Sequence, residues 1–222
     1  MSVADQLKNK SVKSGFTTVG SLGKKLLVGS LVSSAIFLGS ASMSFAHAAQ
    51  WLVENTESRV SFITTKVENV AEVHRFNQVE GELNEQGTFS LNIPLESVDT
   101  AIEIRDQRMR DLLFEIVKFP KLKLSAKIAP GSIEQLAVGD SVSHTIEADV
   151  LLHGQKAMVK FDVLISKLTE NKILVNSLQP VVINASVFNL YDGVEKLRKI
   201  AGLPSVSKAV PVSFVLSLHQ QK

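Results

Sequence analysis

The chain has 222 residues, no cysteine, 45% hydrophobic residues and a formal net charge of +2. The missing cysteine excludes disulfides, a thiol nucleophile, a lipid-modified cysteine anchor and cysteine-based zinc or haem sites. The first 48 residues carry five lysines and one aspartate, so the formal net charge of the remainder is −2. This balance gives no argument for a nucleic-acid partner.

The first 48 residues have the parts of a secretory signal peptide in the usual order. A lysine-bearing stretch precedes Leu26 to Ala46, which holds 21 residues without a charge. Ala46-His47-Ala48 then places small residues where a signal peptidase reads the chain. The uncharged run could also span a bilayer as an uncleaved anchor, but its many serines and glycines weaken insertion. We therefore expect residues 1–48 to be removed before Ala49.

Residues 49–222 alternate between apolar and polar side chains, which is typical of strands with one buried face. Turn-forming pairs such as Pro130-Gly131 and His153-Gly154 separate the segments. Short strands at such regular spacing predict one all-β domain, either a sandwich or a barrel. In the last strand we expect Val212, Phe214 and Leu216 to face inward. The clearest alternating segments are 91–95, 122–128, 146–152, 159–163 and 210–218.

Two segments break the alternation and predict short helices. Thr100 and Glu103 have the spacing of a capping box, in which the two side chains satisfy free amides at a helix start. Asp192 and Glu195 repeat that spacing before a second helix, and Gly202 can end it in a left-handed conformation.

Residues with catalytic or metal-binding potential are few. Ser205 to Lys208 match Ser-x-x-Lys, but the partner motifs of that nucleophile are absent, so a polar turn is the better interpretation. Glu72 and His74 would share one face of a strand and could meet His153 across a barrel. Solvated or hydrogen-bonded side chains explain these residues better than a metal site, so we expect no metal.

Three arginines concentrate positive charge in the first helical segment: Arg105, Arg108 and Arg110. The planar guanidinium suits phosphate or carboxylate oxygens of a ligand. The alternative is pairing within the protein, with Glu103, Asp106 and Asp111 as partners.

Several segments after the predicted signal peptide have the pattern of a known protein family. They are Ser58 to Phe62, Glu72 to Phe76 with Gly81, Ser97 to Arg105, Arg108 to Arg110, Phe119-Pro120 and Leu151 to Gly154. These segments resemble the YceI-like family, the polyisoprenoid-binding proteins of the bacterial periplasm, and the similarity runs over essentially the whole chain after the signal peptide. Leu113-Phe114 replaces the usual pair of phenylalanines, and the Arg-x-x-Phe-Gly segment survives only in part at 185–190, which places the chain in a divergent branch.

The resemblance implies an all-β, lipocalin-like, extended eight-stranded antiparallel barrel with one or two short helices, spanning 49–222. It implies a non-enzymatic periplasmic carrier, without a cofactor, that holds a polyprenyl lipid or an isoprenoid quinone. Homodimers and transient membrane contact also fit the family. The tunnel would be lined by Phe62, Phe76, Met109, Leu113, Phe114, Phe119, Phe161, Phe188, Leu197 and Phe214. The head group would meet Arg105, Arg108, His74 and His153.

Two other functions stay open at this stage. One is a stress-linked periplasmic scavenging or protein-interaction module, with a solid barrel and no lipid ligand. The other is a secreted enzyme, which a buried, metal-loaded histidine cluster would favour. Since a small closed barrel can be packed solid or can hold one ligand, composition alone does not decide between a carrier and an interaction module.

Amino-terminal sequencing of the protein from the periplasmic fraction tests the signal peptide. We expect the first residue to be Ala49 or one within a few positions of it, because Ala46 and Ala48 place small side chains at the cleavage motif. Full-length protein found only in the membrane fraction would contradict this prediction.

Overall fold

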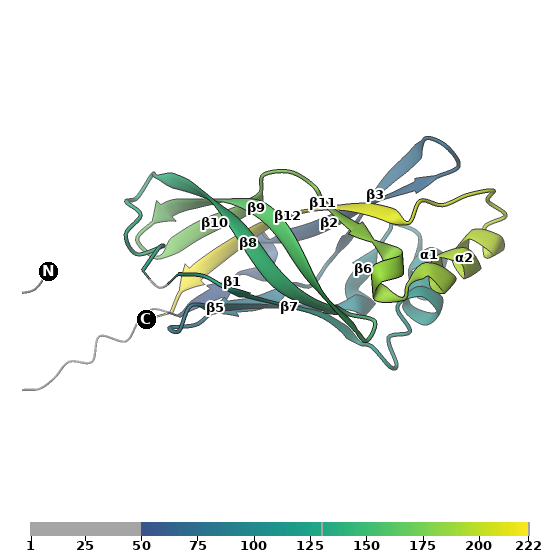
Figure 1. The fold of residues 1–222 in the computed structure, drawn as a ribbon, viewed down its shortest axis with the longest axis horizontal. Coiled ribbons are helices and arrows are strands. Elements are labelled where there is room, and N and C mark those ends of the chain that lie inside the picture. The colour runs from purple at the N-terminus through teal and green to yellow at the C-terminus, as the bar shows by residue number, and fades with distance from the viewer. Residues whose placement is uncertain (1–49, 130, 222) are drawn as a thin grey trace, which may run out of the picture. The chain divides into compact units, whose positions relative to one another are not determined.

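The computed structural model describes residues 50–129 and 131–221, and the predicted signal peptide lies outside them. In this part of the chain, twelve strands form one antiparallel sheet that closes into a barrel (Figure 1). No helix among the described residues is long and apolar enough to cross a bilayer.

Several strands of the barrel are divided into two segments, so the twelve strands correspond to eight strands of the barrel. A 3-10 turn separates β1 from β2, another separates β5 from β6, and β3 and β4 follow each other closely. β10 and β11 both pair with β12. The eight-stranded antiparallel barrel is therefore confirmed. The bounds are β1 Trp51–Val53, β2 Arg59–Lys66, β3 Val70–Phe76, β4 Glu80–Leu83, β5 Thr88–Pro94, β6 Val98–Asp99, β7 Lys121–Lys127, β8 Ser141–Leu152, β9 Gln155–Thr169, β10 Lys172–Ser177, β11 Val181–Asn184 and β12 Ala209–Gln220.

The last strand closes the barrel. β12 pairs with β1 and β10 towards its end and with β2 and β11 nearer its start. Its alternate residues Val212, Phe214 and Leu216 all line the interior, as the sequence predicts. The Phe214 ring meets the Phe161 ring edge to face, with the centroids 5.7 Å apart.

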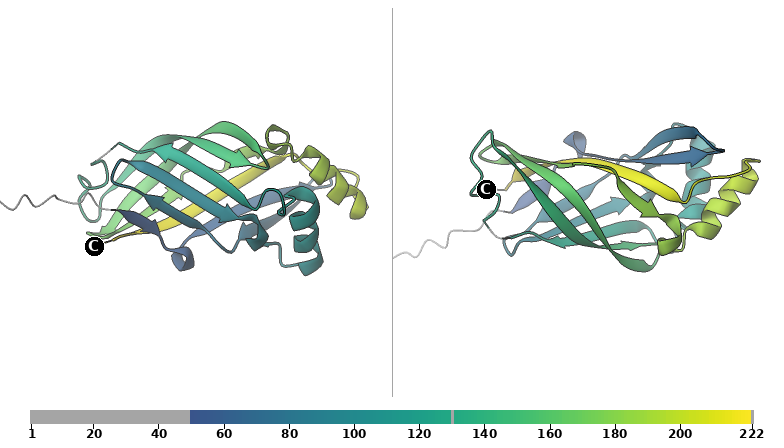
Figure 2. Two further views of the ribbon diagram at one scale, coloured as in Figure 1. Left: turned by 90° about the horizontal axis from the view of Figure 1, so that it is seen from below. Right: turned by 45° about the horizontal axis from the view of Figure 1, so that its top comes forward.

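The helices lie together at one end of the barrel (Figures 1 and 2). α1 (Glu103–Arg108) runs directly into η3 (Met109–Leu113), a turn of π-helix, and α2 (Tyr191–Ile200) packs against η3. The other end is covered by the segment between β7 and β8, whose Ile133 is buried in the core. The barrel therefore has two different ends.

Both predicted capping boxes are wrong, although both helices exist. The N-caps are Ile102 and Leu190, and neither makes a side-chain cap. Thr100 instead bonds to Asp106, and Glu195 pairs with basic residues, so the tertiary partners take precedence over the local motif. Gly202 does have the expected left-handed conformation, with φ of +66°.

The contact between α2 and η3 depends on Gly193. A Cβ atom added there would lie 2.8 Å from the Leu112 carbonyl oxygen and 2.8 Å from the Leu113 Cα. Both contacts are with backbone, which cannot rotate away as a side chain can. The glycine therefore sets how closely the two helical segments approach.

Replacing Gly193 by alanine tests this packing. In an ordinary helix, replacing glycine by alanine raises the free energy of unfolding by about 1 kcal/mol. Here we expect the free energy of unfolding to fall by about 1–3 kcal/mol, because α2 must move away from η3. Lys196→Ala, at an exposed position of the same helix, is the control and should stay within about 0.5 kcal/mol. Chemical denaturation measures both, and a stabilised Gly193→Ala protein would contradict the packing argument.

Candidate ligand-binding site

An apolar cavity occupies the end of the barrel that is closed by the β7–β8 segment. This inner compartment has a volume of about 170 Å³ and is lined only by valine, leucine, isoleucine and phenylalanine. An apolar cavity of about 150 Å³ can stay dry and take up an apolar ligand. Three of the predicted tunnel residues line it: Phe161, Phe188 and Phe214.

A second cavity lies towards the helices. This outer compartment has a volume of about 320 Å³. Six residues line both compartments, so the two adjoin along the barrel: Val60, Ile93, Leu122, Leu152, Ile183 and Val212. The outer compartment holds most of the remaining predicted residues: Phe62, Phe76, Met109, Leu113, Phe114 and Leu197, with His74, Arg105 and Arg108.

Phe119 and His153 line neither compartment. Their rings pack together with centroids 4.6 Å apart, and His153 Nε2 lies 3.0 Å from Glu115 Oε2. Glu115 and His153 both have positive φ, so each is part of a tight turn. Phe119 and His153 together join the segment after η3 to the β8–β9 turn, so both have a packing role. This differs from the tunnel role predicted for Phe119 and the head-group role predicted for His153.

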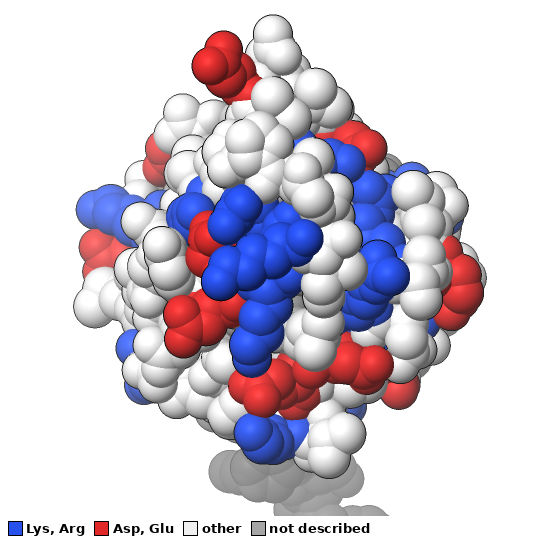
Figure 3. All heavy atoms as spheres, turned by 90° about the vertical axis from the view of Figure 1, so that its right-hand side faces the viewer, with Lys and Arg blue, Asp and Glu red and all other residues white. Residues whose placement is uncertain are grey.

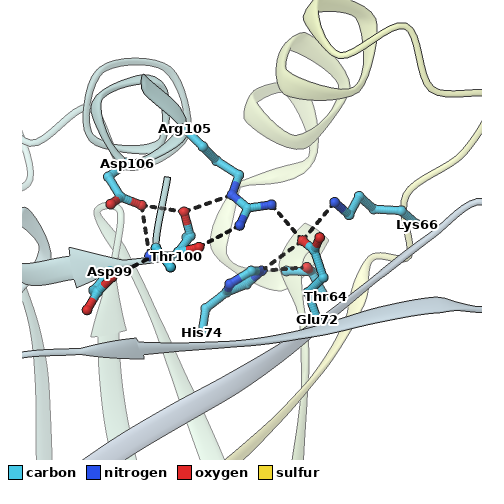
Figure 4. Close-up of polar contacts among 9 residues, drawn as sticks. Thr64, Lys66, Glu72, His74, Asp99, Thr100, Arg105 and Asp106 are labelled. Atoms are coloured by element: carbon cyan, nitrogen blue, oxygen red, sulfur yellow. Dashed lines mark hydrogen bonds and ion pairs between the residues drawn. The ribbon is translucent and has the colours of Figure 1, made fainter. Parts of the chain in front are cut away.

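Each of the three guanidinium nitrogens of Arg105 donates a hydrogen bond to the protein (Figure 4). Its Nε donates to Thr100 Oγ1 at 2.7 Å, its Nη2 to the Thr100 carbonyl oxygen at 2.6 Å, and its Nη1 to Glu72 Oε2 at 2.6 Å. Asp106 accepts the Thr100 amide and hydroxyl. Arg105 thus ties α1 to β3, and its ion-pair partner is Glu72 rather than the aspartates that the sequence suggested.

Glu72 is the centre of this network. Lys66 Nζ lies 2.7 Å from Glu72 Oε2, opposite Arg105. The hydrogen bond from Lys66, and after it the one from Arg105, holds the pKa of Glu72 below its ordinary value despite partial burial. Glu72 therefore stays ionised and compensates part of the positive charge near the mouth.

His74 is neutral and almost fully covered. Its side chain is 3% exposed, its Nε2 lies 2.9 Å from Thr64 Oγ1, and its ring packs on Phe62. Burial lowers its pKa, and the charge of Arg105 lowers it further. Nδ1 is buried without a hydrogen-bond partner among the described residues. His74 thus contributes a ring to the wall and offers no solvent-exposed nitrogen.

Four cations and no carboxylate line the outer compartment: Lys66, Arg105, Arg108 and Arg198. Arg198 Nε is 2.7 Å from Glu195 Oε2, and Glu195 also pairs with Lys208. Hydrogen bonds from Lys208 and Arg198 lower the pKa of Glu195 to about 2, so this carboxylate too stays charged.

Arg108 differs from the other three. Its side chain is half-buried and makes no hydrogen bond or ion pair within the described part of the chain. A partly desolvated charge without a partner is costly. Arg108 can therefore gain more from a ligand oxygen than Lys66, Arg105 or Arg198 can.

The sequence predictions missed Thr64, Lys66 and Arg198 in this lining. A signal existed for each of them. Thr64 and Lys66 follow Phe62 at spacing two, so the same strand face carries all three. Arg198 follows Val194 at spacing four, which puts both on the inward face of α2.

The residues described here contain no group of three or more histidine, aspartate or glutamate side chains that could hold a metal ion. Glu72 and His74 do share a face of β3, with Nε2 3.8 Å from Oε2. His153, however, pairs with Glu115 at the β8–β9 turn. The three predicted candidates for a shared site do not come together.

The chain is similar to several proteins of known structure. A polyisoprenoid binding domain from Saccharophagus degradans, implicated in plant cell wall breakdown, is 32% identical, with 77% of this chain and 98% of that chain covered and a TM-score of 0.76. BcnA of Burkholderia cenocepacia is 18% identical, with 74% and 98% covered and a TM-score of 0.58. A Campylobacter jejuni YCEI protein is 14% identical, with 71% and 88% covered and a TM-score of 0.51.

The last two similarities show the fold alone. A search of curated protein sequences gave no match. The family model for the YceI-like domain matches residues 51–218, nearly the whole described part. This match and the Saccharophagus structure agree with the barrel fold, and the chain belongs to the YceI-like family.

Proposed function

We propose that this protein is an exported, non-enzymatic carrier that holds one isoprenoid lipid lengthwise in its barrel. The observation that carries the proposal is the pair of adjoining compartments, of which the inner is wholly apolar and the outer is apolar with a cationic rim. A tail in the inner compartment and a polar head in the outer one match this polarity. The Saccharophagus domain, described as polyisoprenoid binding, supports the same ligand class.

The energetics suit a long, flexible apolar tail. An isoprene unit has five carbons, and burial gives ~0.8 kcal/mol for each methylene-sized group, so each unit contributes roughly 3–4 kcal/mol gross. Ordering the chain offsets much of this gain. The alternative, an interaction module built on a solid barrel, fits less well with an interior that contains two cavities. Export to the periplasm, with residues 1–48 removed, is part of the proposal.

Mass spectrometry of an organic extract of the purified protein tests the ligand class. We expect an isoprenoid lipid at up to one molecule per chain. A straight-chain fatty acid as the only extracted lipid would contradict the proposal.

Val212→Phe tests whether the tail crosses from one compartment into the other. Val212 lines both compartments, so a larger ring should block the passage. We expect affinity for a long polyprenyl chain to fall at least tenfold, because several isoprene units lose their site. A chain short enough for the outer compartment should bind unchanged. Val215→Phe, an exposed position of the same strand, is the control. Equal binding of long chains by both variants would contradict a continuous tunnel.

Arg108→Met tests the head group. With a prenyl pyrophosphate, the loss of a charge-assisted contact should weaken binding by roughly 1.5–3 kcal/mol. With an isoprenoid quinone, the loss should be about 1 kcal/mol or less, because the carbonyls are neutral. The melting temperature should not fall and can rise slightly, since Arg108 is a partly desolvated charge with no protein partner among the described residues.

Arg105→Met is the matched comparison. It removes one of the two cations that bind Glu72 and the Arg105 donor to the Thr100 carbonyl oxygen, so it should lower stability. Isothermal titration and thermal unfolding separate the two effects. Unchanged affinity of Arg108→Met for both ligands would remove Arg108 from the site.

A further inference from the structure

The rim of the outer compartment carries exposed apolar side chains on three separate elements. They are Val67 after β2, Ile104 in α1 and Ile200 in α2, with exposed fractions of 41%, 57% and 48%. Each directly adjoins in sequence a residue that lines the compartment, namely Lys66, Arg105 and Ala201. Exposed apolar side chains thus occur on three elements that also contribute to the lining of the outer compartment or directly adjoin it.

The tip of the β2–β3 hairpin is fixed to the segment after α2. Val67 N donates to the Ser205 carbonyl oxygen at 3.0 Å, and Ser207 N donates to the Thr65 carbonyl oxygen at 2.9 Å. Val67 has φ of +55°, which is a true outlier for a β-branched residue. The two backbone hydrogen bonds maintain this conformation, and the Val67 side chain stays largely exposed and contributes little to the core.

Positive charge lies on the same end of the molecule. Lys196 and Lys199 are exposed on α2, and their side chains make no ion pair or hydrogen bond within residues 50–129 and 131–221. Figure 3 shows lysine and arginine side chains gathered over the middle of this face, with acidic side chains around them. Glu68 on the hairpin and Asp192 on α2 are nearby exposed carboxylates.

We propose that this end of the barrel docks on an anionic lipid bilayer, with Val67, Ile104 and Ile200 entering the interface and Lys196 and Lys199 meeting lipid phosphates. Basic and apolar side chains combined on one face are the features of interfacial membrane binding. Docking brings the mouth against the bilayer, so an insoluble tail passes between membrane and barrel without crossing water. The role of docking in lipid transfer rests on the proposed carrier function, whereas binding of this surface to a bilayer does not depend on it.

Co-sedimentation of ligand-free protein with vesicles tests the surface. The vesicles are phosphatidylcholine with or without one quarter phosphatidylglycerol, at low salt. We expect binding to the anionic vesicles only, and about 30-fold weaker binding of the Lys196→Gln/Lys199→Gln variant, from ~1 kcal/mol for each lysine. The control is Lys123→Gln/Lys127→Gln, the same charge change on exposed positions of β7.

Val67→Asp should weaken vesicle binding in the same assay without lowering the melting temperature, because the side chain is exposed. Lack of binding to anionic vesicles, or equal losses in the α2 and β7 variants, overturns the docking proposal. Isoprenoid binding is titrated separately in solution. A protein that binds the lipid but not vesicles refutes docking alone, whereas one that docks but binds no isoprenoid refutes the carrier function and leaves the surface standing.

Discussion

β12 is hydrogen-bonded to four other strands along twelve residues, and this ladder is the constraint on which the cavity depends. In a closed barrel each strand is hydrogen-bonded to a neighbour on both edges, and alternate side chains point into the interior. On β12 those side chains are valine, phenylalanine and leucine, which leave space between them at the centre of the barrel. The interior is apolar because of the sequence alternation, and it is open because the ladder fixes the barrel width.

The ion pairs around the outer compartment leave Arg108 as the one cation in its lining without a carboxylate partner among the described residues. Glu72 and Glu195 each bind two cations, so three of the four cations that line the outer compartment have a carboxylate partner inside the protein. Both carboxylates have lowered pKa values and stay ionised at neutral pH. Arg108 has no such partner, which makes it the position where an arriving oxygen atom changes the electrostatic energy most.

Much of the fold follows from the sequence because period-two alternation is a local signal. It correctly predicted the inward row of β12 and an all-β domain, whereas the choice of a barrel over a sandwich came from the resemblance to the YceI-like family. The predictions that failed depended on partners outside the local motif. Thr100 has the spacing of a cap, but Asp106 binds it, and Arg105 pairs with Glu72, 33 residues earlier in the chain. Phe119 is large and apolar, as a tunnel residue is expected to be. It nevertheless packs on His153 at a turn whose geometry the sequence does not specify.

The meeting of β1 with β12 also bears on the order of folding. Trp51 is paired with Gln220, so the seam of the barrel joins the two ends of the described chain. Chains emerge amino-terminus first during synthesis, and pairing over such sequence separations is slow because loop closure must precede it. Until its final strand arrives, the barrel stays open along its whole length. The apolar interior is therefore enclosed only once the last strand of the described chain has paired with β1 and β2.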